Sequence, residues 1–274
     1  MTTPPRRPRC PARAAASRRR AAARCAAALA AAAAAFAAPR AQAAEVLVAV
    51  AANFAGPLAR IGEAFSAATG HTLKVSSGAT GKFYTQVAAG GAPFEVLLAA
   101  DDETPRRLLA EGHAVPGSAF TYAIGQLVLW SRTPGLVDGD GAVLASPRFR
   151  RLAIANPKVA PYGAAALQVL QARGLHAAVA DRLVTGESIA QAHQFALTGN
   201  ADLAFVALSQ VAVPGRAPEG SLWRVPPALY REIRQDAVLL KAGAHNPAAR
   251  ALLDHLRGPA ARALIEAHGY ALPR

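Results

Sequence analysis

Small or polar residues stand at four points where an apolar, strand-like segment gives way to a helix-like one. These four turns are Ala52-Asn53, Ala79-Thr80-Gly81, Pro161-Tyr162-Gly163 and Ser188-Ile189. The first backbone N–H groups of a helix have no partner inside the helix, and the helix dipole adds partial positive charge there. Such helix starts bind oxyanions without a cationic side chain. The turns therefore indicate an anion site made of neutral donors, although Asn and Thr before a helix are also ordinary caps.

The other motifs of the sequence do not support catalysis or metal binding. The segment 76–83 resembles a phosphate-binding loop, but it lacks the first glycine and the hydroxyl residue that would hold Mg²⁺. The whole sequence contains no nucleophile with an evident base, no dinucleotide-binding fingerprint and no esterase nucleophile elbow. The seven histidines do not show metal-ligand spacing. We therefore expect no catalytic residues, no coordinating metal ligands and no cofactor, and Lys82 is the cation nearest to the proposed site.

Alternating strand-like and helix-like segments must position these turns. The expected strands are 45–52, 73–76, 94–100, 122–130, 152–155, 183–185, 202–207 and 234–240. The expected helices are 54–69, 82–89, 102–112, 164–173, 187–197, 247–257 and 259–267. This alternation predicts an α/β fold with parallel sheets, in which ligands bind beyond the carboxyl ends of the strands.

The alternating pattern falls into two blocks, joined by long strands near 122–130 and 234–240. The blocks predict two lobes with a two-strand hinge: residues 44–122 with 236–274 form one lobe, and residues 123–235 form the other. If the lobes face each other, the four turns converge on one cleft.

Composition excludes two broad classes of protein. The chain has 274 residues, of which 53% are hydrophobic and 17% charged, so it does not belong with disordered proteins. Its net charge of +13 suggests a nucleic-acid binder. Nine arginines lie in residues 1–43, however, and the rest of the chain holds 21 basic and 17 acidic residues. A net charge of +4 gives no electrostatic reason to expect nucleic acid as a partner.

Residues 1–43 have the pattern of a cleaved export signal. An arginine-rich start precedes an uncharged run, 25–39, that is shorter than the ~20 residues of a membrane span. Ala41-Gln42-Ala43 then suits signal peptidase, with cleavage after Ala43. The segment 17–20 also suits the twin-arginine route, so the Sec and twin-arginine routes both stay open. Because Cys10 and Cys25 precede the cleavage point, we expect the mature protein to contain no cysteine. We also expect it to be soluble and periplasmic, with a monomer as the default for a binding protein.

An ordered set of segments resembles the family of periplasmic molybdate-binding proteins of ABC transporters. The segments are 51–54, 76–84, 91–101, 156–163, 205–210 and 256–259, and the similarity extends over residues 45–274. The resemblance implies a two-lobed class II periplasmic-binding-protein fold, in which each lobe is a mostly parallel sheet flanked by helices. In this family the lobes close on a tetrahedral oxyanion that is held by neutral donors.

The resemblance also implies which residues hold the anion. By position, the contacts fall on Asn53 with the backbone of Ala52, on Thr80 where relatives often have Ser, and on Tyr162. The last contact falls on the backbone N–H of Ile189, where Val is common.

The expected function is capture of molybdate and tungstate and their delivery to the membrane permease of an ABC transporter. A protonated oxyanion such as hydrogenphosphate would need an acceptor, whereas the four turns supply chiefly donors. A receptor for sulfate, for another oxyanion or for a small organic acid remains the alternative. An exported enzyme and a ligand-sensing module are the rivals from other classes.

Overall fold

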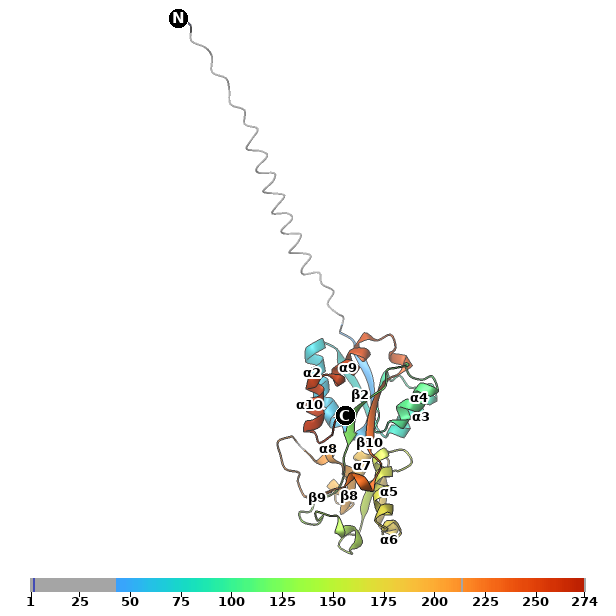
Figure 1. Ribbon diagram of the computed structural model, residues 1–274, viewed down its shortest axis with the longest axis vertical. Helices are drawn as coiled ribbons and strands as arrows, with labels where there is room; N and C mark the ends of the chain where they lie inside the picture. Colours follow the sequence, from blue (N-terminus) through green and yellow to red (C-terminus); the bar gives the residue numbers. More distant parts are fainter. Residues whose placement is uncertain (1, 3–42, 213, 274) are drawn as a thin grey trace. The chain divides into compact units, whose positions relative to one another are not determined.

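Two mixed sheets of five strands each form in the described part of the chain, which comprises residue 2, residues 43–212 and residues 214–273 of this computed structural model. The export signal predicted for residues 1–43 lies outside the described residues, apart from Thr2 and Ala43. The chain from Ala43 onward makes one compact unit (Figure 1). None of the described helices is both long and apolar enough to span a bilayer.

The first sheet has the strand order β2-β1-β3-β10-β4. Its strands are β1 (Glu45–Ala51), β2 (Thr72–Gly78), β3 (Val96–Leu98), β4 (Phe120–Gly125) and β10 (Ile233–Leu239). β1 pairs in parallel with β2 and β3, whereas β10 is antiparallel to both β3 and β4. Among these strands β10 alone therefore runs against the others.

The second sheet repeats this plan with the order β7-β6-β8-β5-β9. Its strands are β5 (Leu127–Ser131), β6 (Leu152–Ala155), β7 (Leu183–Gly186), β8 (Leu203–Ala207) and β9 (Ser221–Arg224). β6 is parallel to β7 and β8, and β5 is antiparallel to β8 and β9. The predicted α/β fold with two lobes is confirmed, and each sheet is mostly parallel with one reversed strand.

Helices cover both faces of the first sheet (Figure 1). One face packs against α2 (Ala55–Thr69), α9 (Pro247–Arg257) and α10 (Pro259–Ala267), and the other packs against α3 (Thr80–Ala88) and α4 (Glu103–Ala110). Side chains alternate along a strand, so Val48 and Val50 of β1 face the first group while Ala49 faces the second. Burial on both faces explains the continuous apolar runs of β1 and β3.

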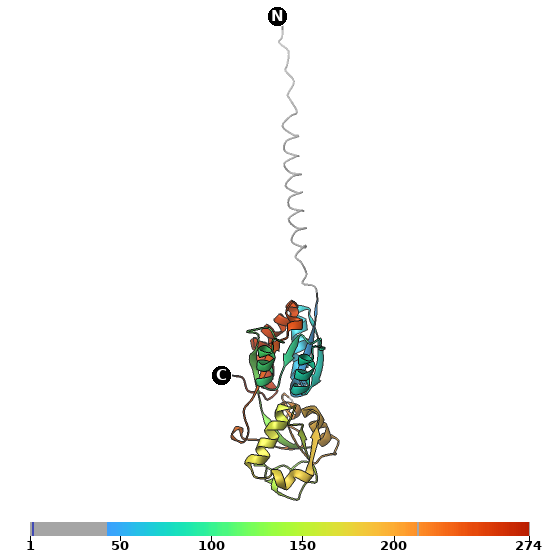
Figure 2. The same ribbon diagram turned by 90° about the vertical axis from the view of Figure 1, so that its right-hand side faces the viewer.

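The second sheet is covered in the same way (Figure 2). Leu127 and Leu129 of β5 face a core with α5 (Pro161–Ala172) and α6 (His176–Val179), whereas Val128 and Trp130 face α7 (Ile189–Leu197) and α8 (Leu208–Val211). Short 3-10 turns complete the fold: η1 (Ala52–Phe54), η2 (Ala142–Ala145), η3 (Ala180–Arg182), η4 (Pro227–Leu229) and η5 (Lys241–Gly243).

The chain passes between the sheets at two places. β4 ends at Gly125 and β5 begins at Leu127, so the single strand predicted for 122–130 is in fact two strands in different sheets. A Cβ atom at Gly125 would overlap the hydroxyl group of Tyr162, and this close approach explains why glycine stands at the break. The chain returns to the first sheet through η4 and β10.

Candidate ligand-binding site

A small pocket lies beyond the carboxyl ends of β1, β2, β6 and β7. It is lined by Ala51, Ala52, Asn53, Gly78, Ala79, Thr80, Ala100, Ala160, Pro161, Tyr162 and Ile189. These residues come from η1 and from the starts of α3, α5 and α7, with Ala100 following β3. All five residues that the sequence singled out, Ala52, Asn53, Thr80, Tyr162 and Ile189, thus meet at one pocket, and their role as ligand contacts stays a prediction.

Thr80 is the first residue of α3, and its side chain is 1% exposed. Its Oγ1 accepts a hydrogen bond from the backbone N–H of Ala100 at 3.0 Å. Because a hydroxyl group both accepts and donates, this bond leaves the proton of Thr80 for another acceptor. The bond to Ala100 therefore fixes the oxygen at the pocket wall with a donor still available.

Asn53 is 2% exposed and lies in η1, immediately before α2. The ordinary alternative for an asparagine before a helix, a cap, does not apply, because the side chain makes no capping hydrogen bond. Its Nδ2 donates instead to Oε1 of Gln235 at 2.7 Å and to the hydroxyl oxygen of Tyr270 at 3.0 Å. Its backbone oxygen accepts from Ser209 at 2.9 Å and from Tyr270 at 2.8 Å. Long-range polar contacts thus hold Asn53 in place.

Tyr162 and Ile189 reach the pocket from the second sheet. The hydroxyl oxygen of Tyr162 accepts a hydrogen bond from Nε2 of Gln235 at 3.4 Å, and the residue is 1% exposed. Burial raises the pKa of Tyr162 well above its ordinary value, so the hydroxyl stays neutral at physiological pH. Ser188 caps α7 by accepting from the backbone N–H of Gln191, and this cap places Ile189 in the first turn.

Backbone N–H groups at the pocket are free to donate. Thr80, Tyr162 and Ile189 each lie in the first turn of a helix, where the backbone N–H has no partner within the helix. In residues 43–212 and 214–273 these three N–H groups make no hydrogen bond to the backbone elsewhere. The pocket therefore combines three main-chain donors with the hydroxyl group of Thr80.

The lining of the pocket is electrically neutral. It contains no Lys, Arg, His, Asp or Glu among the described residues. Lys82, the cation nearest in sequence, pairs with Glu187 at 2.7 Å, and both side chains are about half exposed or more. The described residues also contain no group of three His, Cys, Asp or Glu that could hold a metal ion. An anion in this pocket would thus be held by neutral hydrogen-bond donors.

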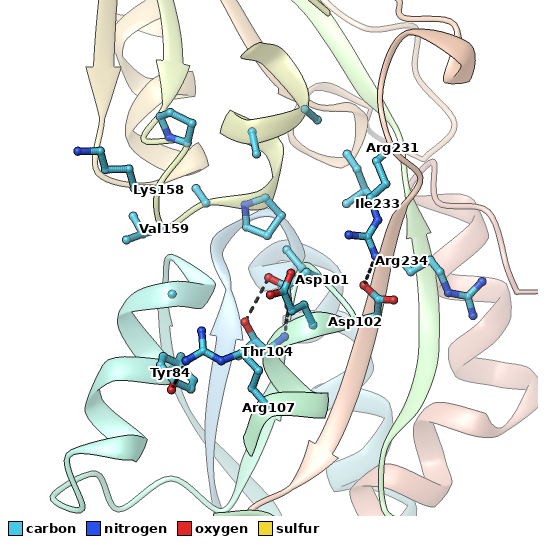
Figure 3. Close-up of a pocket in the computed structure, with 18 of the residues that line it drawn as sticks. Tyr84, Asp101, Asp102, Thr104, Arg107, Lys158, Val159, Arg231, Ile233 and Arg234 are labelled. Atoms are coloured by element: carbon cyan, nitrogen blue, oxygen red, sulfur yellow. Dashed lines mark hydrogen bonds and ion pairs between the residues drawn. The ribbon is translucent and has the colours of Figure 1, made fainter. Parts of the chain in front are cut away.

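A larger cavity of about 420 Å³ adjoins this pocket and shares Ala100, Ala160 and Pro161 with it. Charges of both signs line the cavity (Figure 3). Asp102 pairs with Arg231 at 3.2 Å, and Asp101 accepts from the backbone N–H of Thr104 at 2.8 Å. Burial raises the pKa of Asp101, and the hydrogen bonds from Thr104 oppose that shift. The carboxylates make this cavity a poor anion site.

Three polar residues behind the pocket were missed by the sequence analysis. They are Ser209, Gln235 and Tyr270, which contact Asn53 from α8, from β10 and from the segment after α10. Gln235 is 0% exposed although it lies in a strand. Its sequence neighbours are the charged residues Arg234 and Asp236, so no local pattern indicated that this glutamine is buried.

Two α/β lobes with a buried neutral pocket at their helix starts define a class of protein, the two-lobed solute-binding proteins. Comparison with known proteins leads to the same class. A family model described as bacterial extracellular solute-binding protein matches residues 46–271. The molybdate-binding protein ModA of Azotobacter vinelandii is 58% identical over 232 residues, which cover 85% of this chain and 92% of that protein. ModA of Rhodobacter capsulatus is 53% identical over 206 residues, which cover 75% and 80%.

A solved structure shows the same similarity in three dimensions. The periplasmic molybdate-binding protein of Azotobacter vinelandii superimposes with a TM-score of 0.82 at 44% sequence identity, and the match covers 84% of this chain and 100% of that one. The chain therefore belongs to the family of bacterial extracellular solute-binding proteins. The resemblance noted from its motifs is confirmed, and the chain is a binding protein without a cofactor rather than an enzyme.

Proposed function

We propose that this chain is a periplasmic binding protein that captures molybdate and tungstate and delivers them to the permease of an ABC transporter. The observation that carries the proposal is the convergence of four helix starts on one buried pocket without charged residues. The two relatives named for molybdate binding, at 58% and 53% identity, support molybdate as the ligand.

The chemistry of the pocket suits a fully deprotonated oxyanion. A buried dianion is costly unless its oxygens receive hydrogen bonds, and bonds to a charged acceptor are about twice as strong as neutral ones. Thr80 supplies a hydroxyl proton and a backbone N–H, while Tyr162 and Ile189 supply backbone N–H groups. The lining has no carboxylate and no cationic side chain, so it offers no opposite charge to a cation or a zwitterion. We therefore expect the pocket to prefer tetrahedral dianions.

Capture requires the lobes to move. Asn53, Thr80 and Tyr162 are at most 2% exposed, so a ligand cannot reach them unless the two sheets separate. Polar contacts between the lobes beside the pocket include the hydrogen bond from the backbone N–H of Gly81 to the carbonyl of Val159 at 2.9 Å and the pair of Lys82 with Glu187. An anion that bridges donors from both sheets favours the closed form, because only that form places all donors around it.

The remaining parts of the proposal follow from the sequence. We propose export by the signal in residues 1–43 and a periplasmic, monomeric mature chain that does not bind nucleic acid. The proposed lobe limits, 44–122 with 236–274 and 123–235, fall within or beside β4 and β10, the strands through which the chain leaves and re-enters the first sheet. A monomer with a closed and an open form suits recognition by a permease that receives only the loaded protein.

Calorimetric titration of the chain beginning at Ala44 tests the proposal. That chain contains both sheets and all four hydrophobic cores. After extensive dialysis, molybdate, tungstate, sulfate and phosphate are added separately at one ionic strength. The expected result is tight binding of molybdate and tungstate, with sulfate and phosphate at least about 100-fold weaker, a discrimination of about 2.7 kcal/mol.

The other outcomes have distinct meanings. Equal binding of sulfate would replace the proposal by a general receptor for oxyanions. Absence of heat with all four anions, together with binding of a small organic acid, would overturn the anion site and leave the solute-binding class.

A further inference from the structure

Gln235 is a fully buried amide that contacts pocket residues from both sheets. It lies on β10 where the pairing with β4 shifts register between Gln235 and Asp236. Its Oε1 accepts from Nδ2 of Asn53 at 2.7 Å and from the hydroxyl of Tyr122 at 3.3 Å. Its Nε2 donates to the hydroxyl oxygen of Tyr162 at 3.4 Å. One side chain thus links η1, which follows the first strand, to the start of α5.

The amide of Asn53 is only partly satisfied. Both N–H bonds of Nδ2 are used, one by Gln235 and one by Tyr270. Its Oδ1 is buried and has no hydrogen-bond partner among the described residues. A buried oxygen without a donor is unfavourable, and an acceptor is the wrong group to present to a deprotonated anion. Asn53 lines the pocket, and in this orientation the one polar atom of its side chain without a partner is an acceptor, which the proposed ligand would repel.

A 180° turn of both amides removes this conflict. Tyr270 then donates its proton to Oδ1 of Asn53 instead of to the backbone oxygen of Asn53, which keeps its hydrogen bond from Ser209. Nε2 of Gln235 then donates to Oδ1 of Asn53, and Tyr162 donates its proton to Oε1 of Gln235. Nδ2 of Asn53 becomes free for an anion. Amide nitrogen and oxygen are similar in size, so this exchange needs no change in packing. Asn53 cannot turn alone, because its Oδ1 would then face Oε1 of Gln235 at hydrogen-bond distance.

We propose that Gln235 is a positioning residue of the anion site, whose amide orientation decides whether Asn53 presents a donor or an acceptor to the ligand. The same orientation decides whether Tyr162 keeps its proton for the pocket. Gln235 thereby couples a residue beside the first sheet to a residue of the second. This inference rests on the proposed function, since it takes a fully deprotonated oxyanion as the ligand.

A double-mutant cycle on molybdate affinity tests the coupling. The variants are Gln235→Met, which keeps the size but removes the amide, Asn53→Ala, and the two combined. We expect Gln235→Met alone to weaken molybdate binding about 10-fold, by analogy with loss of a buried hydrogen bond. In the Asn53→Ala background the same change should cost less than about threefold, because Gln235 acts through Asn53. A second cycle with Tyr162→Phe checks the other contact.

Gln235→Glu separates positioning from packing. A carboxylate accepts at both oxygens, so it holds the N–H of Asn53 and the proton of Tyr162 away from the ligand and adds negative charge. It should weaken molybdate binding about 100-fold or more, beyond Gln235→Met. If Gln235 only supported the fold, affinity would instead follow the melting temperature of each ligand-free variant. Gln86→Met, an exposed change on α3, is the matched control and should bind as the parent chain does.

The outcomes distinguish the two proposals. If the parent chain does not bind molybdate, the proposed function fails. If it binds, and the effects of Gln235→Met and Asn53→Ala simply add, the positioning role is overturned while the function stands. Should Gln235→Met not fold, the cycle is run with Gln235→Glu, and additivity there is equally decisive.

Discussion

The two sheets bring their helix starts to the pocket in the same way, but they supply different kinds of donor. The first sheet offers the backbone N–H of Thr80 and two polar side chains, the hydroxyl of Thr80 and the amide of Asn53, and both side chains are held by long-range hydrogen bonds. The second sheet contributes mainly the backbone N–H groups of Tyr162 and Ile189, at the starts of α5 and α7.

This difference predicts which changes the site tolerates. A backbone N–H group is present whatever side chain the residue carries, so the second sheet's donors depend on helix geometry alone. A hydroxyl or amide donor is lost with its side chain, and its buried partners are then left unpaired. Substitutions beside the first sheet should therefore lower affinity far more than substitutions beside the second.

Among changes at the residues that line the pocket, Thr80→Val should show the largest effect. The change keeps the shape of the side chain but removes the hydroxyl donor and leaves the backbone N–H of Ala100 without its partner. We expect molybdate affinity to fall about 100-fold, corresponding to about 2.7 kcal/mol, in a calorimetric titration. Thr198→Val, at the exposed end of α7, is the control and should change affinity less than twofold. Unchanged binding by Thr80→Val would show that side-chain donors of the first sheet do not matter.

Alkaline pH should destabilise the polar network behind Asn53. Burial raises the pKa of Tyr270 to about 12, above the value of about 10 expected in the unfolded chain. Between pH 10 and pH 12 the folded state holds the Tyr270 proton more tightly than the unfolded state does. The contribution of protonated Tyr270 to the free energy of unfolding is therefore complete below pH 10 and is lost as the pH rises to 12. The loss should reach on the order of 2–3 kcal/mol in urea unfolding at pH 12, compared with pH 9. Tyr270→Phe should flatten this dependence, and an equally steep fall in that variant would contradict the assignment.

Lys82→Met should have a small effect that depends on salt. The pair with Glu187 is about half exposed, and such pairs contribute at most about 1 kcal/mol. We expect molybdate affinity to fall threefold or less at low ionic strength and not at all in 0.5 M sodium chloride, where charges are screened. Glu187→Gln should reproduce this result, and a large loss that persists in salt would place Lys82 in contact with the anion.

Ile189→Val should show the smallest effect and completes the comparison. The backbone N–H of Ile189 stays in the first turn of α7, capped by Ser188, so molybdate affinity should change less than twofold. The lost methylene group of a 4% exposed side chain should still lower the free energy of unfolding by about 0.5–1.5 kcal/mol. A loss of affinity as large as that of Thr80→Val would show that both sheets depend on side chains.

Local sequence patterns predicted the parts of the site that depend on local structure. Asn53, Thr80, Tyr162 and Ile189 follow apolar strand segments, and the carboxyl ends of parallel strands necessarily meet at one edge of their sheet. The two terminal helices were predicted with the bounds that α9 and α10 have in the structure. These features depend on neighbours only a few residues away.

The polar network was not predictable because its partners are distant in sequence. Tyr270 lies 217 residues from Asn53, and Gln235 lies 182 residues from it. Capping remained an alternative for Asn53 at the level of the sequence, since cap preference is a local rule and the long-range hydrogen bonds that hold the side chain leave no local trace. The break between β4 and β5 was visible only as a glycine, because the contact of Gly125 with Tyr162 arises from the packing of the two sheets.

The ion pair between Lys82 and Glu187 joins α3 to the loop before α7, and both residues are open to solvent. The sequence after Ala43 contains no cysteine. Cysteines placed at these two positions would therefore be the sole attachment points for a pair of spectroscopic labels. The separation of the labels would report directly on whether the lobes are open or closed, so the protein offers a ready scaffold for an optical sensor of its ligand.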